Sequence, residues 1–176
     1  MLLDRLFRPR PARAIGQALY QRVVDQSRAP GLYADIGAPD TVEGRFEIYT
    51  LHAVLLIERL RGHGEQAAEV SQALFDAYVK SLDHALREMG VGDLSVGKKM
   101  RKLGEALFGR ARSYEQAFHA LPATELLEAL LIRTIFADAD AAGAPRLAAY
   151  VTDQRAHLGA QDLDRLLAGE VDWRPV

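Results

Sequence analysis

Apolar residues recur at helical spacing along almost the whole chain, and this pattern limits the possible folds more than any other feature. A representative run places Leu74, Tyr78, Leu82 and Leu86 four residues apart, so their side chains share one helix face. Sustained strand-like alternation and two-residue hairpin turns are missing from the sequence. The helical periodicity predicts an all-α fold. Because 176 residues can bury a core without disulfides or metals, we expect a single compact domain of six to eight helices.

Stretches rich in proline and glycine separate the predicted helices. Two of them, at residues 28–40 and 138–145, predict loops. The helices are expected at residues 12–28, 40–61, 65–89, 95–120, 122–136, 146–158 and 162–170. We divide the chain into a short basic N-terminal segment (1–11), an all-α domain (12–170) and a C-terminal tail (171–176).

Several helix ends carry recognisable capping residues. Asp40, followed three residues later by Glu43, resembles a capping box and predicts the start of the second helix. Gly90 is well placed to stop the third helix, and Ser95 can cap the next one. Gly109 is a candidate kink within that fourth helix.

The composition excludes several kinds of site. The chain has no cysteine, and therefore no disulfide, thiolate metal site or cysteine nucleophile. Its first residues do not resemble a signal peptide, and the longest nearly uncharged apolar run, residues 48–57, is too short to span a bilayer. We therefore expect a soluble cytoplasmic protein, or one that sits peripherally on the inner face of the cytoplasmic membrane.

Positive charge is concentrated in two regions of a chain whose net charge is only −2. Residues 1–28 carry six basic and two acidic groups, and residues 95–112 carry six basic and one acidic. Residues 29–94, by contrast, carry five basic and eleven acidic groups. This distribution predicts local contact with an anionic partner, while the overall balance argues against a dedicated nucleic-acid-binding protein.

The stretch GVGDLSVGK, residues 90–98, combines three glycines with a lysine at a helix start, a setting in which backbone N–H groups can bind anions. It lacks the spacing of a Walker P-loop and does not follow a strand, so a nucleotide site is disfavoured. The simpler interpretation is a tight turn between two helices. In that turn Gly90 should adopt a positive φ, because glycine tolerates this backbone conformation best.

The helix after this turn has a strongly basic face. Lys98, Arg101 and Lys102 share one side, and Lys99 lies beside the apolar seam. The seam that we expect to be buried consists of Val96, Met100, Leu103 and Leu107. The basic face is either a solvated surface or a docking surface for anionic lipid, RNA or an acidic protein segment. Aromatic residues on which bare bases could stack are missing from residues 95–107. The candidate docking residues are Lys98, Lys99, Arg101, Lys102, Arg110 and Arg112.

The five histidines do not form a metal or catalytic motif. No HExxH motif and no pair of histidines four residues apart occurs, and no Glu-x-x-His motif of a di-metal bundle is present. His52 lies within the apolar second helix, where a buried, hydrogen-bonded structural role is favoured over a ligand role. We find no catalytic constellation, and we predict a protein that is not an enzyme and needs no metal or cofactor.

Three strings together resemble the ubiquinol–cytochrome c chaperone family of assembly factors for the cytochrome bc1 complex. They are PDTVEGRFEIYTLHAVLLIERL (39–60), ALFDAYVKSLDHALREMGVGDLSVGKKMRKL (73–103) and AAYVTDQRAHL (148–158). The opening LYQRVVDQSRAPGLYADIGAPD is also similar to the family's N-terminal segment, and the resemblance covers roughly residues 19–170. The strings GRFE…LH and LREMGVGD are the most specific. The family-motif residues are Asp40, Arg45, Phe46, Glu47, His52, Arg87, Glu88, Gly90, Gly92, Asp93 and Lys98.

The resemblance implies an all-α assembly chaperone whose partner is cytochrome b or another bc1 subunit. Mitochondrial members act with a small partner at the ribosomal tunnel exit, where they bind newly made cytochrome b until its haem is in place. This chain shows no targeting peptide or membrane-anchoring extension and looks like the bacterial form.

The competing hypothesis is an RNA- or ribosome-binding helical module that uses the basic helix. We further suggest that Arg87 and Glu88 pair with Arg45, Glu47 or Asp93 and fix the interhelical turn to the second helix.

Overall fold

The computed structural model describes residues 11–88, 90, 92–137 and 139–176, and it confirms the all-α prediction. Within these residues the structure contains α-helices and one π-helical turn, and no strand. None of the described helices is both long and apolar enough to cross a membrane. The elements are α2 (Pro11–Ser27), α3 (Pro30–Ala34), α4 (Val42–Leu60), α5 (Glu65–Glu88), α6 (Asp93–His119), α7 (Glu125–Leu131) with its π-helical continuation (Ile132–Phe136), α8 (Ala144–Ala160) and α9 (Leu163–Leu167).

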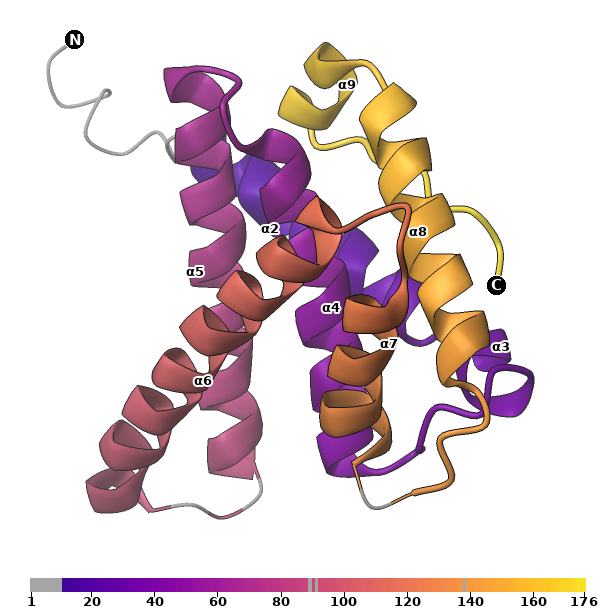
Figure 1. The fold of residues 1–176 in the computed structure, drawn as a ribbon. Coiled ribbons are helices and arrows are strands. Elements are labelled where there is room, and N and C mark those ends of the chain that lie inside the picture. Colours follow the sequence, from indigo (N-terminus) through magenta and orange to yellow (C-terminus); the bar gives the residue numbers. More distant parts are fainter. Residues whose placement is uncertain (1–10, 89, 91, 138) are drawn as a thin grey trace, which may run out of the picture.

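Helix α4 forms the centre of the molecule (Figure 1). It contacts α2, α5, α6 and α8, as well as the π-helical turn. Its residues Ile48, Leu51, Leu55 and Leu56 are completely buried. Apolar side chains occupy more than one face of this helix, so neighbouring helices can pack on several of its sides. The wide apolar face seen in the sequence therefore corresponds to a helix surrounded by others.

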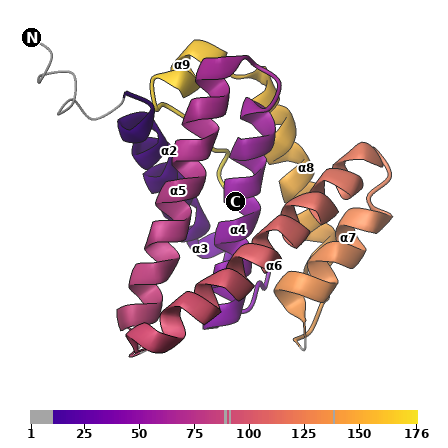
Figure 2. The same ribbon diagram turned by 90° about the vertical axis from the view of Figure 1, so that its left-hand side faces the viewer.

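Helices α5 and α6 form a long hairpin, and α6 runs from the end of α5 across α4 to α7 (Figure 2). The predicted tight turn between them is confirmed, since α5 ends at Glu88 and α6 begins at Asp93. Gly90 has a φ of +81°, and its N–H donates to the carbonyl of Arg87 at 3.0 Å. A left-handed glycine directly after a helix ends it in the predicted way.

Two predicted caps are wrong. Helix α4 is capped by Thr41 instead of Asp40: the Thr41 hydroxyl accepts a hydrogen bond from the Gly44 N–H at 3.0 Å. Asp40 instead forms an ion pair with Arg45, which occupies its carboxylate. Helix α6 begins at Asp93, with Gly92 as its N-cap, so Ser95 lies inside the first turn.

Two other predicted boundaries also differ from the structure. The expected loop at residues 28–40 contains the short helix α3, which begins at Pro30, a favoured first helical residue. Helix α7 begins at Glu125 and not at Pro122, which belongs to the turn at residues 120–122. Helix α6 runs through Gly109 as predicted, since one glycine costs a helix only about 1 kcal/mol and packing against α7 can offset it; the kink at Gly109 stays a prediction.

Candidate functional site: an apolar groove beside a basic helix

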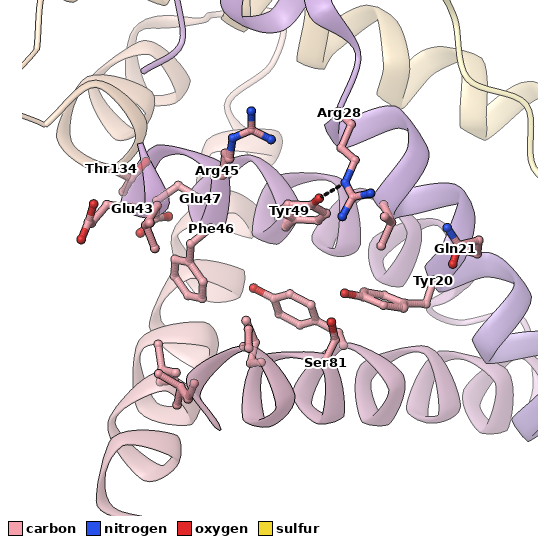
Figure 3. A pocket seen from close by; sticks show the side chains of 17 residues that line it. Tyr20, Gln21, Arg28, Glu43, Arg45, Phe46, Glu47, Tyr49, Ser81 and Thr134 are labelled. Carbon is pink, nitrogen blue, oxygen red and sulfur yellow. Dashed lines mark hydrogen bonds between the residues drawn. The ribbon is translucent and has the colours of Figure 1, made fainter. Parts of the chain in front are cut away.

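An open groove of about 740 Å³ lies where α4 and α5 separate (Figure 3). Residues 61–64 join the C-terminal end of α4 to the N-terminal end of α5, so the two helices are held together there. The groove forms towards their other ends, between the N-terminal half of α4 and the C-terminal half of α5. The C-terminal half of α2 provides a third wall.

Most of the groove wall is apolar. Its aliphatic and aromatic lining consists of Val24, Val42, Phe46, Leu82, Ala85, Leu86 and Leu103. Val42 is 62% exposed and extends this apolar lining at the edge of the groove. A concave and largely apolar surface of this size falls within the range of ligand and peptide sites.

Tyrosines supply several of the hydroxyl groups inside the groove. Tyr20 and Tyr78 are buried and their rings pack 6.1 Å apart, measured between ring centres. The Tyr78 hydroxyl lies 2.7 Å from the hydroxyl of Thr50, which itself donates to the Phe46 carbonyl at 2.8 Å. Burial raises the pKa of both tyrosines. They therefore stay neutral near pH 7, and the floor of the groove carries no charge from them.

Two arginines lie at the edge of the groove. The Arg28 Nε donates to the Tyr49 hydroxyl at 2.8 Å (Figure 3). Arg45 is paired with Asp40, and its guanidinium also lies over the Tyr33 ring, 5.1 Å from the ring centre. The carboxylate of Asp40, just before the start of α4, therefore balances the charge of Arg45. The described residues include no acidic partner for Arg28.

Glu47 and Arg110 form a two-pronged ion pair at the end of the groove next to α6. The Arg110 Nη2 and Nε donate to the two Glu47 carboxylate oxygens at 2.8 and 2.9 Å. The Glu47 side chain is only 9% exposed, so its carboxylate is largely removed from water, whereas the Arg110 side chain is 30% exposed. Hydrogen bonding to Glu47 raises the pKa of Arg110. Arg110 therefore connects α6 to α4, and it does not belong to the exposed basic surface in which the sequence placed it.

The remaining basic residues of α6 do face solvent. Lys98, Lys99, Arg101, Lys102 and Arg112 are all exposed, and together they are called the basic strip below. Val96 and Leu107 are buried, whereas Met100 and Leu103 are half-buried, so the predicted seam is only partly covered. Leu103 also lines the groove, and the basic strip therefore borders one end of it.

The family-motif residues near the turn have mostly local partners. Arg87 pairs with Asp83 at 2.8 Å, and Glu88 lies 3.2 Å from His84, each one turn away on α5. Arg45 and Glu47 pair with Asp40 and Arg110, not with the turn as we had suggested. The side chain of Asp93 lies outside the part of the chain that can be described.

His52 is completely buried and both ring nitrogens are bonded, as the sequence predicted. Its Nδ1 lies 2.8 Å from the Ile48 carbonyl, which can only accept, so Nδ1 carries the proton. Its Nε2 then accepts from the Tyr150 hydroxyl at 2.8 Å. Burial lowers the pKa of His52 to about 4. Among the described residues no cluster of side chains suited to a metal ion is found.

Sequence reasoning missed the groove residues of α2. Tyr20, Val24 and Arg28 are spaced four residues apart and all line the groove. Their spacing places them on one helix face, next to the core-facing Leu19 and Val23. The signal that could have identified them is their own four-residue spacing, which makes a second stripe of aromatic, aliphatic and cationic residues along the helix. It predicts a helix face, but the neighbours of that face depend on the tertiary structure.

The comparisons with known proteins agree with one another. The model of the ubiquinol-cytochrome C chaperone family matches residues 34–173. The crystal structure of the Cbp3 homolog from Brucella abortus is similar to this structure, with a TM-score of 0.86 and 34% sequence identity. That similarity covers 99% of this chain and 97% of the Brucella chain. No curated protein matches the sequence.

Proposed function

Because the chain belongs to the ubiquinol-cytochrome C chaperone family, we propose that it holds newly made cytochrome b near the membrane while the bc1 complex is assembled. The family resemblance inferred from the sequence is confirmed, and with it the general role of an assembly chaperone for this complex. The client and the place of action are the parts that we propose.

The observation that carries the proposal is the open apolar groove between α2, α4 and α5. A chaperone for a membrane protein must cover apolar segments that would otherwise aggregate in water, and a groove lined by Phe46, Leu82 and Leu86 offers matching surface. Burial of apolar surface contributes roughly 25 cal/mol per Å². This contribution allows reversible binding without a covalent or catalytic step.

The basic strip supports a position close to the membrane. An exposed cation at an anionic lipid surface contributes about 1 kcal/mol, and the attraction decays within a Debye length. Several such residues give reversible attraction that is too weak for permanent anchoring. We propose that the protein acts in the cytoplasm and on the inner face of the cytoplasmic membrane, where cytochrome b is inserted.

The proposed role needs no catalytic group, and two buried polar residues of α4 have structural partners. Glu47 is neutralised by Arg110, and both nitrogens of His52 are bonded within the core. We propose a protein without enzymatic activity and without a cofactor.

A deletion strain tests the proposal directly. We expect the strain to lose most assembled bc1 complex, and to regain it when the wild-type gene is returned. Cytochrome b should also co-purify with the tagged protein from solubilised membranes, more strongly when assembly is stalled by removing another bc1 subunit. A normal level of bc1 complex in the deletion strain would contradict the proposed function.

A further inference from the structure

The groove has the shape expected for binding a helix. Two of its walls are antiparallel helices, α4 and α5, that separate towards one end. Its apolar lining runs from Val24 on α2 to Leu103 on α6, and Val42 extends it at the edge. Grooves between helices commonly receive an amphipathic helix, whose apolar residues at i, i+3, i+4 and i+7 fill the space between the walls.

Arg28 adds a charge requirement to this shape. Its Nε is bonded to the neutral hydroxyl of Tyr49, which holds the guanidinium at the edge of the groove. The described residues offer no acceptor to its two terminal nitrogens. Arg45, Arg87, Arg110 and Arg155 are by contrast each paired with a carboxylate. Arg28 is therefore a positioned cation with two terminal nitrogens that can donate to the two oxygens of one carboxylate in bidentate fashion.

The two ends of the groove differ in charge. Glu43 lies at the end of the groove away from Arg28 (Figure 3). It would repel a carboxylate placed there, so an acidic residue on the bound segment is favoured at the end beside α2, where Arg28 lies. Shape and charge together specify one kind of occupant.

We propose that the groove binds an amphipathic helix of the client that carries an apolar face and one carboxylate directed to Arg28. This inference rests on the proposed function, in which the client is a protein segment. The apolar face contributes most of the binding free energy, and the pairing with Arg28 selects among apolar helices. The groove is thus a selective site, because purely apolar segments leave the guanidinium without an acidic partner.

A peptide selection tests the inference without assuming which client binds. Random peptides of about sixteen residues, long enough for roughly four helical turns, are displayed and selected on the full-length protein. We expect the selected peptides to carry apolar residues at i, i+3, i+4 and i+7 and one aspartate or glutamate at a fixed position. If no peptide is recovered, or if the recovered peptides lack an acidic residue, the inference is wrong.

Affinity measurements on the protein then identify the contact residues. A fluorescein-labelled selected peptide should bind wild type about tenfold more tightly than its twin with glutamine in place of the acid. Arg28→Gln should remove that difference, whereas Arg22→Gln, an exposed arginine on α2 outside the groove, should preserve it. Equal discrimination by wild type and Arg28→Gln would show that the carboxylate is bound elsewhere.

A steric variant tests the groove itself. Ala85 lines the groove on α5, so Ala85→Trp should fill it and abolish binding of both peptides. Ala149→Trp places the same side chain on an exposed part of α8 and should bind like wild type. Circular dichroism and thermal melting confirm that both variants fold. Unchanged binding by folded Ala85→Trp overturns the inference.

Other occupants give distinct results. If wild type forms dimers that Ala85→Trp prevents in sedimentation experiments, the occupant is a second copy of the chain and the client helix is excluded. If native mass spectrometry finds a bound phospholipid that Ala85→Trp lacks, and no peptide displaces it, the groove is a lipid site. Either result contradicts the inference.

Failure of this inference can be separated from failure of the proposed function. If Ala85→Trp restores bc1 assembly to a deletion strain that lacks it, the assembly function stands and the groove is not the client site. If the deletion strain assembles bc1 normally while the peptides bind as expected, the groove inference holds for another client class and the assembly function fails.

Discussion

A histidine in the middle of an apolar core destabilises the fold unless it is neutral and both ring nitrogens are hydrogen-bonded. His52 meets these conditions through the Ile48 carbonyl and the Tyr150 hydroxyl, while the Trp173 ring packs edge-on at 5.2 Å between ring centres. The Tyr150 hydroxyl in turn accepts from the Gln26 side-chain amide at 2.8 Å. His52 therefore links α4 to α2, α8 and the C-terminal segment.

Protonation of His52 should destabilise the fold. Its pKa is about 4 in the folded protein because burial opposes the charged form, against 6.5 for an ordinary histidine. The unfolded chain therefore binds more protons between these values, and stability falls as the pH decreases from 6.5 towards 4. The full loss amounts to roughly 3 kcal/mol, whereas above pH 6.5 the stabilisation is complete.

Urea unfolding of wild type and His52→Gln across this pH range isolates the effect from the titration of carboxylates. His52→Gln should be less stable near pH 7, and the difference in unfolding free energy between the two proteins should shrink as the pH falls. A difference that stays constant down to about pH 4 would mean that His52 does not titrate in the expected way.

At the scale of elements, the turn between α5 and α6 sets the direction of the basic helix. The turn depends on Gly90, whose φ of +81° is poorly tolerated by residues with a branched side chain. A Cβ atom at this position would meet no other atom within 4 Å, so any cost of substitution comes from the backbone and not from a collision.

Gly90→Val should therefore lower the unfolding free energy by more than about 1 kcal/mol. Gly92→Ser is the matched control, because Gly92 has a φ of −65° and open space around it, and serine is a favoured N-cap. The control should match or slightly exceed wild type in thermal and urea unfolding. Equal stability of the two variants would show that the left-handed backbone is not the limiting feature of the turn.

Across the whole molecule, exposed positive charge is concentrated on α6. The exposed cations of α6 form one strip, whereas Arg110 is used internally by Glu47. Because exposed lysines and arginines contribute little to folding, the strip can be changed without altering the core. Its role can therefore be tested independently of stability.

Replacement of Lys98, Lys99, Arg101 and Lys102 by glutamine should leave the melting temperature nearly unchanged. Binding to liposomes that contain anionic phospholipid should weaken, most visibly at low salt, because screening shortens the range of the attraction. A double variant, Arg133→Gln with Arg146→Gln, removes exposed charge elsewhere and should bind like wild type.

Two outcomes would redirect this prediction. If the quadruple variant binds liposomes and client like wild type at low ionic strength, the strip is an ordinary solvated surface. If wild type instead binds RNA or ribosomes with a steep dependence on salt, the alternative of a nucleic-acid-binding helical module gains support.

The fold class, the approximate course of the longer helices and the turn at Gly90 could be predicted from the sequence alone. These features follow from the period of the apolar residues and from the backbone freedom of glycine, both of which are local. The burial of His52 could also be predicted, because it lies within the apolar stretch of α4. The N-cap of α4 was harder to predict, because Asp40 and Thr41 are both suitable residues. Thr41 caps the helix, since the Asp40 carboxylate is bound to Arg45.

The contacts between residues of distant elements could not be predicted in this way, because they depend on the packing of the helices. Arg110 belongs to the basic segment of the sequence, yet it pairs with Glu47, 63 positions away. Residues 171–176 were expected to form a tail, but Trp173 packs on His52, and the Arg174 N–H and carbonyl bond the side chain of Gln154. The groove likewise arises where α4 and α5 separate. Helical periodicity fixes which face a residue occupies, whereas the neighbours of that face depend on how the helices cross and pack.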